Sequence, residues 1–360
     1  MGKPTLYNFN AGPAALPAEV LEAASQAITN FNGMGLSLLE IGHRTEPFIA
    51  VMEEARQLAK ELLHLGEEHE VLFLHGGATT QFMQLPMNFL SSDKKAAYTE
   101  TGTWSVKAIA EAKHFGTVEI AGSSKADAFR SIPKTLSVSP DAAYLHITTN
   151  ETIAGTQWHE IPYTSGVPLV ADMSSDIFSR TMQFSAFDMI YAGAQKNMGA
   201  AGVTMVVLKK SWVASITNNV PSIMDYRNHL KEESMLNTPP VFAVYVAMLT
   251  LRWLKAQGGI AAIEKINDAK AALLYATIDQ CPVYTAPVAK ADRSKMNVVF
   301  TMQDTALEKK LLDECKQNGI YGIKGHRSVG GFRASLYNAV SLEATQVLSA
   351  LLTDFAQRHG

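Results

Sequence analysis

Two apolar runs on either side of a lysine constrain the fold of this chain more than any other stretch. Met189–Ala194 and Val203–Leu208 each have the length and apolar character of a buried strand. Lys196 follows the first run, and the very small residues Gly199–Gly202 precede the second. An ammonium group beside a buried strand costs free energy unless it is paired or neutralised.

Such a lysine has two interpretations. Desolvation lowers a lysine pKa and frees the amine to form an imine, and small neighbours would leave room for a flat ring. The plainer alternative is a lysine that reaches solvent beside a glycine-rich turn, since lysines usually escape burial. Lys196 is therefore a candidate nucleophile that the rest of the chain must support.

The composition is that of a soluble globular protein, with 47% hydrophobic and 18% charged residues among 360. The net charge of −3 gives no reason to expect nucleic acid or an anionic membrane surface as a partner. The longest apolar segment, Val241–Leu251, is too short to span a bilayer, and the N-terminus lacks a secretory apolar run. With only two cysteines we expect no disulfide framework, a reducing compartment and a cytoplasmic location.

Hydrophobic periodicity predicts strands that alternate with helices through the first two-thirds of the chain. This alternation favours an α/β fold with a mostly parallel sheet covered by helices on both faces. The last third is more mixed, so we expect a second, smaller domain from about residue 260. Strands are predicted at 71–74, 95–99, 118–121, 143–148, 168–171, 189–194, 203–208, 296–302, 322–324 and 332–336. Helices are predicted at 17–31, 46–65, from 81 onward, 103–115, 239–257, 260–279, 306–318 and 342–359.

A glycine-rich segment, Gly76–Thr80, lies between a predicted strand and a predicted helix. Backbone N–H groups at a helix start bind phosphate, and the hydroxyls of Thr79 and Thr80 would add donors. The segment matches neither a Walker motif nor GxGxxG. A tight turn with no ligand is the alternative.

Three polar or aromatic residues near predicted strand ends could contact a planar ligand. Asp172 could hold a proton on a ring nitrogen, or it could simply cap a helix. Trp104, at a predicted helix start, could stack on a ring, although such a residue is more often part of the core. Thr152 could bond a ring hydroxyl, or it could belong to a polar turn.

Basic residues gather in two segments that could recognise an acidic substrate. His43 and Arg44 lie in an early loop, and His326, Arg327 and Arg333 lie in a glycine-rich stretch near the C-terminus. Arginine binds carboxylate and phosphate in a bidentate manner, but ordinary surface arginines would give the same pattern. We predict no metal site, because the His and Glu residues at 64–70 lack a spacing that would bring ligands together.

Together these groups are the set that pyridoxal phosphate binding requires: a phosphate site, a ring stacker, a carboxylate, a hydroxyl, an imine-forming lysine and cations for the substrate. At this point the chain resembles the phosphoserine aminotransferase family, of the class V aminotransferases within the fold type I pyridoxal-phosphate enzymes. The resemblance runs almost end to end. It is carried by NFNAGPAALP near the start, EIGHR at 40–44, HGGATTQF at 75–82, NET at 150–152, ADMSS at 171–175, YAGAQKNMGAAG at 191–202, MLNTPP at 235–240 and GIKGHRSVGGFRASLYNA at 322–339.

The resemblance implies a reaction, a fold and a set of cofactor residues. The reaction interconverts 3-phosphohydroxypyruvate and L-glutamate with O-phospho-L-serine and 2-oxoglutarate in serine biosynthesis, and many bacterial members also act in pyridoxine biosynthesis. The fold is a large domain with a seven-stranded type of sheet at 16–259 and a smaller α+β domain at 1–15 and 260–360. The resemblance assigns Lys196 as the Schiff-base lysine, Asp172 to the pyridinium nitrogen, Trp104 to ring stacking, Thr152 to the ring hydroxyl, and Ala78, Thr79 and Gln195 to the cofactor phosphate.

The family is a homodimer with shared sites, which would place Asn237 and Thr238 at the partner subunit's cofactor. His43, Arg44, His326, Arg327 and Arg333 match its substrate-anion residues. This chain departs from some members by having Ala78-Thr79 where they have Gly-Arg, so an arginine contact would be missing.

Three alternatives remain at this point. A cysteine desulfurase of the same fold would need a reactive cysteine on a mobile loop, but Cys315 lies in a helical pattern and Cys281 beside Pro282. A phosphometabolite-binding protein with no cofactor and a nucleotide-dependent enzyme that uses HGGATT as its phosphate loop are the other two.

Overall fold

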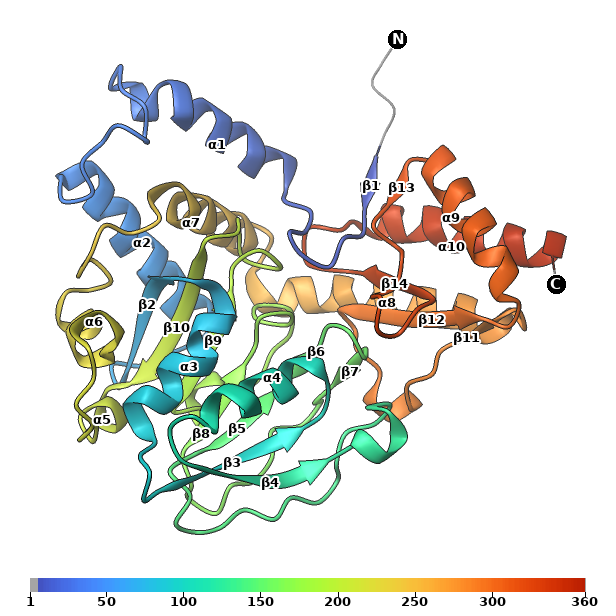
Figure 1. The fold of residues 1–360 in the computed structure, drawn as a ribbon. Coiled ribbons are helices and arrows are strands. Elements are labelled where there is room, and N and C mark those ends of the chain that lie inside the picture. The colour runs from blue at the N-terminus through green and yellow to red at the C-terminus, as the bar shows by residue number, and fades with distance from the viewer. Residues whose placement is uncertain (1–5, 360) are drawn as a thin grey trace.

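A computed structural model describes residues 6–359 of the chain (Figure 1). Its centre is a seven-stranded sheet in which five neighbouring strands are parallel, while β10 is antiparallel to both of its neighbours. The predicted mostly parallel sheet is therefore confirmed. In spatial order the strands are β2 (His69–His75), β10 (Val203–Lys209), β9 (Met189–Gly193), β8 (Leu169–Asp172), β5 (Leu145–Thr148), β3 (Lys95–Glu100) and β4 (Thr117–Ser123).

Helices cover both faces of this sheet because its strands are apolar on both sides. Along β2, Val71 and Phe73 join one buried cluster, whereas the alternate residues Leu72 and Leu74 join another. The first cluster packs against α1 (Ala18–Thr29), α2 (Glu46–Leu62) and α7 (Val241–Ala256). The second packs against α3 (Gly77–Phe89), α4 (Thr103–Ala112), α5 (Lys210–Val213) and α6 (Tyr226–Lys231).

A third apolar cluster, separate from the sheet, is built from the C-terminal third and from Phe9 near the N-terminus. The short strand β1 (Tyr7–Asn8) pairs in parallel with β13 (Ile320–Tyr321), so the N-terminal segment joins the C-terminal unit (Figure 1). That unit contains a three-stranded antiparallel sheet, β11 (Tyr284–Thr285), β12 (Asn297–Met302) and β14 (Phe332–Ser335), with α8 (Gly259–Gln280), α9 (Glu308–Gln317) and α10 (Leu342–His359).

The remaining elements are short. A two-stranded antiparallel hairpin follows β5 and spans residues 150–157. None of the helices in residues 6–359 has both the length and the apolar character that a membrane crossing requires. The hairpin is β6 (Asn150–Glu151) and β7 (Thr156–Gln157), and the 3-10 turns are Phe31–Gly33, Lys125–Asp127, Phe184–Ala186, Ser222–Met224, Lys290–Asp292 and Thr305–Leu307.

Two sequence-based predictions were wrong in position. Helix α3 begins at Gly77 rather than Gln81, because Gly76 adopts a φ of 97° and turns the chain directly into the helix. The strand predicted at 322–324 is displaced to Ile320–Tyr321, whose partner is β1. Gly322 instead has a φ of 83°, and a Cβ there would lie 2.5 Å from the backbone nitrogen of Asn10.

Candidate active site

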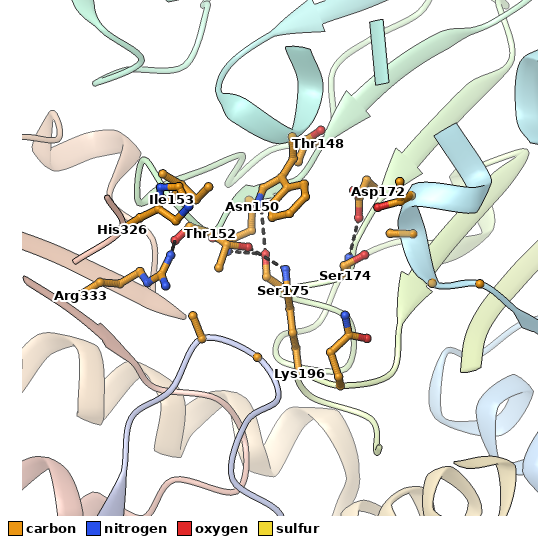
Figure 2. Close-up of a pocket in the computed structure, with 18 residues that line it drawn as sticks. Thr148, Asn150, Thr152, Ile153, Asp172, Ser174, Ser175, Lys196, His326 and Arg333 are labelled. Atoms are coloured by element: carbon orange, nitrogen blue, oxygen red, sulfur yellow. Dashed lines mark hydrogen bonds between the residues drawn. The ribbon is translucent and has the colours of Figure 1, made fainter. Parts of the chain in front are cut away.

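A cavity of about 360 Å³ opens at the carboxyl ends of β5 and β8, where ligands commonly bind in open α/β sheets (Figure 2). Its walls come from the N-terminal segment, the starts of α3 and α4, the hairpin β6–β7, the turn after β9 and the segment around His326. Nine of the residues singled out from the sequence line it: Ala78, Thr79, Trp104, Thr152, Asp172, Gln195, Lys196, His326 and Arg333.

Lys196 lies in the turn that joins β9 to β10, and its Nζ donates a hydrogen bond of 2.7 Å to Thr152 Oγ1 (Figure 2). The same Nζ lies 5.7 Å from the centre of the Trp104 ring. Burial lowers the pKa of Lys196 to about 8, although the nearby carboxylates of Asp172 and Glu151 act in the opposite direction. The lysine therefore faces the cavity with an amine that is partly neutral near physiological pH.

Gly199, one of the small residues after Lys196, allows close packing. A Cβ at Gly199 would lie 3.0 Å from the Cα of Ala247, so this glycine lets the turn approach α7 closely. The backbone N–H of Ala14 donates to the carbonyl of Gln195 over 2.9 Å and ties the N-terminal segment to the same turn.

Asp172 ends β8 and is almost fully buried, with 5% of its surface exposed. Its Oδ1 accepts a hydrogen bond of 2.9 Å from the backbone N–H of Ser174 (Figure 2), so it also shapes the turn that follows the strand. Oδ2 accepts no hydrogen bond of standard geometry within residues 6–359, although the Ser174 side chain lies close enough to lower the pKa of this carboxyl. Burial raises the pKa of Asp172, and the ammonium of Lys196 lowers it. A carboxylate with one open acceptor thus borders the cavity.

Trp104 occupies the first turn of α4, and its indole Nε1 is buried without a hydrogen-bond partner among the described residues. Its backbone N–H and that of Ser105 donate to the two carboxylate oxygens of Glu151, over 3.2 and 3.0 Å. From the sequence, Glu151 was placed in the NET motif at 150–152 but was assigned no role. The absence of a capping side chain at Gly102, which precedes the helix, was the available signal.

The start of α3 presents backbone N–H groups to the cavity. Gly76 and Gly77 both have positive φ values, 97° and 72°, which place Ala78 and Thr79 in the first helical turn. The hydroxyl of Thr80 donates to the carbonyl of Gly76 over 2.9 Å. The expectation that Thr80 donates to an anion is therefore wrong, because its proton is used within the turn.

Cations gather on the side of the cavity that faces the C-terminal unit. Arg333 Nη1 donates to the carbonyl of Thr152 over 3.1 Å, and its Nε is buried without a partner among the described residues. Burial lowers the pKa of His326, and the positive charges of Arg333, Arg327 and Lys107 lower it further. No carboxylate within residues 6–359 forms an ion pair with these four side chains. An anionic ligand would therefore meet little competition from carboxylates for Arg333, His326, Arg327 and Lys107.

Five predicted site residues do not line this cavity: His43, Arg44, Asn237, Thr238 and Arg327. Thr238 nevertheless lies near its edge, since its carbonyl accepts a 2.7 Å hydrogen bond from Nε2 of His75, the residue before Gly76. His43 Nε2 is buried without a partner among the described residues, and the side chain of Arg44 is exposed.

The family comparison decides what kind of protein has this site, since the model of the family "Aminotransferase class-V" matches residues 6–348. The chain belongs to the class-V aminotransferases. It is 54% identical to the phosphoserine aminotransferase of Flavobacterium johnsoniae, over 95% of this chain and 96% of the relative. It is 49% identical to that of Bacillus subtilis over 98% of both chains.

Solved structures agree with this assignment. The phosphoserine aminotransferase of Bacillus circulans subsp. alkalophilus matches with a TM-score of 0.96 and 42% identity over 99% of each chain. A phosphoserine aminotransferase from Trichomonas vaginalis, described as bound to pyridoxal phosphate, matches with a TM-score of 0.91 and 37% identity over 97% of this chain and 99% of its own. Both comparisons confirm the fold type I architecture predicted for this class-V aminotransferase.

The cysteines do not support a desulfurase. Cys315 is buried within α9, and burial raises the pKa of its thiol to about 12. Cys281 follows α8 and does not line the cavity. Because a sulfur-transfer nucleophile must be an accessible thiolate, neither residue suits that reaction.

Proposed function

We propose that this class-V aminotransferase binds pyridoxal 5'-phosphate and interconverts 3-phosphohydroxypyruvate and L-glutamate with O-phospho-L-serine and 2-oxoglutarate. One observation carries the proposal: the Lys196 amine, the Asp172 carboxylate and the Trp104 ring meet in one cavity, beside cations that no carboxylate of residues 6–359 pairs. The names of relatives at 54% and 49% identity support the choice of a phosphorylated substrate.

The residues present fit the cofactor. The open oxygen of Asp172 suits a protonated pyridine nitrogen, and Trp104 offers a flat face beside Lys196. Thr152, already bonded to Lys196, would approach the ring hydroxyl. Ala78 and Thr79 at the start of α3, together with Gln195, would hold the phosphate. An arginine is not required for that contact, because the helix start supplies backbone donors.

The bound cofactor supplies a carbonyl carbon that an amine can attack and a ring that accepts an electron pair. Lys196 Nζ would supply that amine and, once displaced, would serve as the base that carries a proton between the substrate α-carbon and the cofactor. Asp172 holds a proton at the ring nitrogen with its negative charge. Trp104, which lines the cavity, would stack on one face of the ring and shield that face from water.

The cationic side of the cavity selects the substrate. Arg333 and His326 line the cavity and Arg327 lies beside His326, so together they suit a ligand with a carboxylate at one end and a phosphate at the other. A phosphate monoester carries nearly two negative charges at neutral pH, and it gains more from these cations than an uncharged group.

A homodimer would complete the site. His43, Arg44, Asn237 and Thr238 lie outside the cavity of this subunit. We propose that they reach the partner subunit's site, the last two at the cofactor phosphate and the first two at the substrate anion.

We further propose a division into domains at 16–259 and at 1–15 with 260–360, of which residues 1–5 and 360 lie outside the described residues. A cytoplasmic location and a second reaction in pyridoxine biosynthesis belong to the same proposal.

An assay with purified, cofactor-loaded protein tests the function. Formation of 2-oxoglutarate from glutamate is followed with 3-phosphohydroxypyruvate or, as the matched control, with hydroxypyruvate. We expect kcat/KM for the phosphorylated acceptor to exceed that for the control by a factor of about 100 or more, since several charge-assisted contacts are lost. Equal use of the two acceptors, or no turnover of either, would contradict the proposal.

A further inference from the structure

Glu151 is a fully buried carboxylate that neither the sequence reasoning nor the proposed mechanism uses. It ends strand β6, directly before Thr152, and its exposed fraction is 0%. Its two oxygens accept hydrogen bonds from the backbone N–H groups of Trp104 and Ser105, over 3.2 and 3.0 Å. The Glu151 side chain therefore joins helix α4, which carries Trp104, to strand β6, which leads to Thr152, the hydrogen-bond partner of Lys196.

The local sequence accommodates a carboxylate at this position. Ser105 Oγ accepts the N–H groups of Thr101 and Gly102, over 2.9 Å each, while Glu151 accepts those of Trp104 and Ser105. A Cβ at Gly102 would lie 2.4 Å from Cδ of Glu151, so glycine is needed for this approach. The positive end of the helix favours an anion here, and the hydrogen bonds offset part of its desolvation.

Glu151 also acts electrostatically on the cavity. Together with Asp172 it opposes the loss of a proton from Lys196, whose Nζ is bonded to the neighbouring Thr152. Burial and the charge of Asp172 raise the pKa of Glu151 to about 7, while the N–H groups of α4 lower it. Arg333, which bonds the carbonyl of Thr152, contributes the opposing positive charge. A capping role alone would not require a position so close to these charges.

We propose that Glu151 is a positioning residue of the active site: it fixes Trp104 relative to Thr152 and sets a second negative charge opposite the Lys196 amine. The proposal rests on the proposed function, because it concerns how the chain presents Lys196 and Trp104 to the cofactor. Because one carboxylate bonds two consecutive N–H groups, it holds helix α4 to hairpin β6–β7 at two points.

The test compares Glu151→Gln with the wild type, using cofactor-free protein and added pyridoxal phosphate. The rate of cofactor capture, followed by absorbance, is measured against pH, and its midpoint reports the proton on Lys196. In the wild type the midpoint should lie near 8. In Glu151→Gln we expect it to fall by about one pH unit, since a nearby opposite charge is removed. We also expect kcat of the loaded enzyme to fall by about tenfold. A glutamine amide has one acceptor oxygen, so one of the two hydrogen bonds that hold the start of α4, and with it Trp104, is lost.

Two further variants separate positioning from helix capping. Asp225→Asn removes another carboxylate that caps a helix, bonded to the N–H of Arg227 over 2.9 Å and remote from the cavity lining, and should leave the midpoint unchanged. Glu151→Asp keeps the charge but shortens its reach, so it should retain the midpoint and lose part of kcat.

An unshifted midpoint in Glu151→Gln, or an equal shift in Asp225→Asn, would overturn the proposal. So would full kcat in Glu151→Asp, which remains measurable if the glutamine variant does not fold. Failure of the proposed function gives a different result, because the wild type would then capture no cofactor at any pH.

Discussion

The lowered pKa of Lys196 predicts how the cofactor-free protein should respond to pH. At pH 8 about half of the Lys196 amines would be neutral, against about 0.3% for a lysine with its ordinary pKa of 10.5. Because only the neutral amine attacks a carbonyl, burial makes Lys196 more than about 100-fold richer in the reactive form at this pH.

The perturbation that tests this reasoning is Asp172→Asn, which removes the carboxylate that most strongly favours the Lys196 ammonium. The pKa of Lys196 should then fall below 8, so the neutral fraction at pH 7 should rise from about a tenth toward a half if the shift is about one unit. Cofactor capture at pH 7 should therefore accelerate by several-fold even though catalysis is impaired.

The assay is stopped-flow absorbance of cofactor capture between pH 6 and 10, with Lys196→Arg as the control that cannot capture. The wild-type rate should rise tenfold per pH unit below about 8 and level off above it. A rate that continues to rise to pH 10 would show an ordinary lysine and refute the desolvation argument. A midpoint that moves upward in Asp172→Asn would refute the assignment of its charge.

Three other substitutions follow from the same structure. Lys196→Ala should abolish transamination, and near-normal turnover in the assay with 3-phosphohydroxypyruvate would contradict its role. Gly102→Ala should destabilise the protein by about 1–3 kcal/mol in urea unfolding, because its Cβ would clash with the Glu151 carboxylate, and an unchanged midpoint would show that the clash relaxes. Lys270→Met should cost about 1–3 kcal/mol by the same measurement, since the buried amine donates to three carbonyls within 336–340 at 2.9 Å each and the substitution leaves them without this donor; an unchanged midpoint would count against this network.

Much of the architecture could be predicted from hydrophobic periodicity. The final helix was expected at 342–359 and lies at Leu342–His359, and Val203–Lys209 differs from its prediction by one residue. In both segments the local pattern of apolar residues is enough to predict the type of element and its bounds. Of the nine predicted residues that line the cavity, Trp104, Thr152, Asp172 and Lys196 were found from their positions just after strands or at a helix start, whereas the roles of Ala78 and Gln195 came only from the family resemblance.

Other features depend on partners that are distant in sequence. The pairing of Tyr7–Asn8 with Ile320–Tyr321 joins opposite ends of the chain, and two-residue strands leave no periodic pattern. Glu151 caps a helix from 46 residues away, whereas helix caps are normally read from the residues just before the helix. Thr80 was assigned the wrong role because its hydroxyl returns to Gly76, a choice that depends on where the helix begins.

The central claim is that the Lys196 amine is the group that binds the cofactor aldehyde covalently. Borohydride reduction of the cofactor-loaded protein, followed by peptide mapping, tests it most directly. The account predicts a single pyridoxyl label on the peptide that contains Lys196. Label on another lysine, such as the buried Lys270, or no label after reduction, would contradict it.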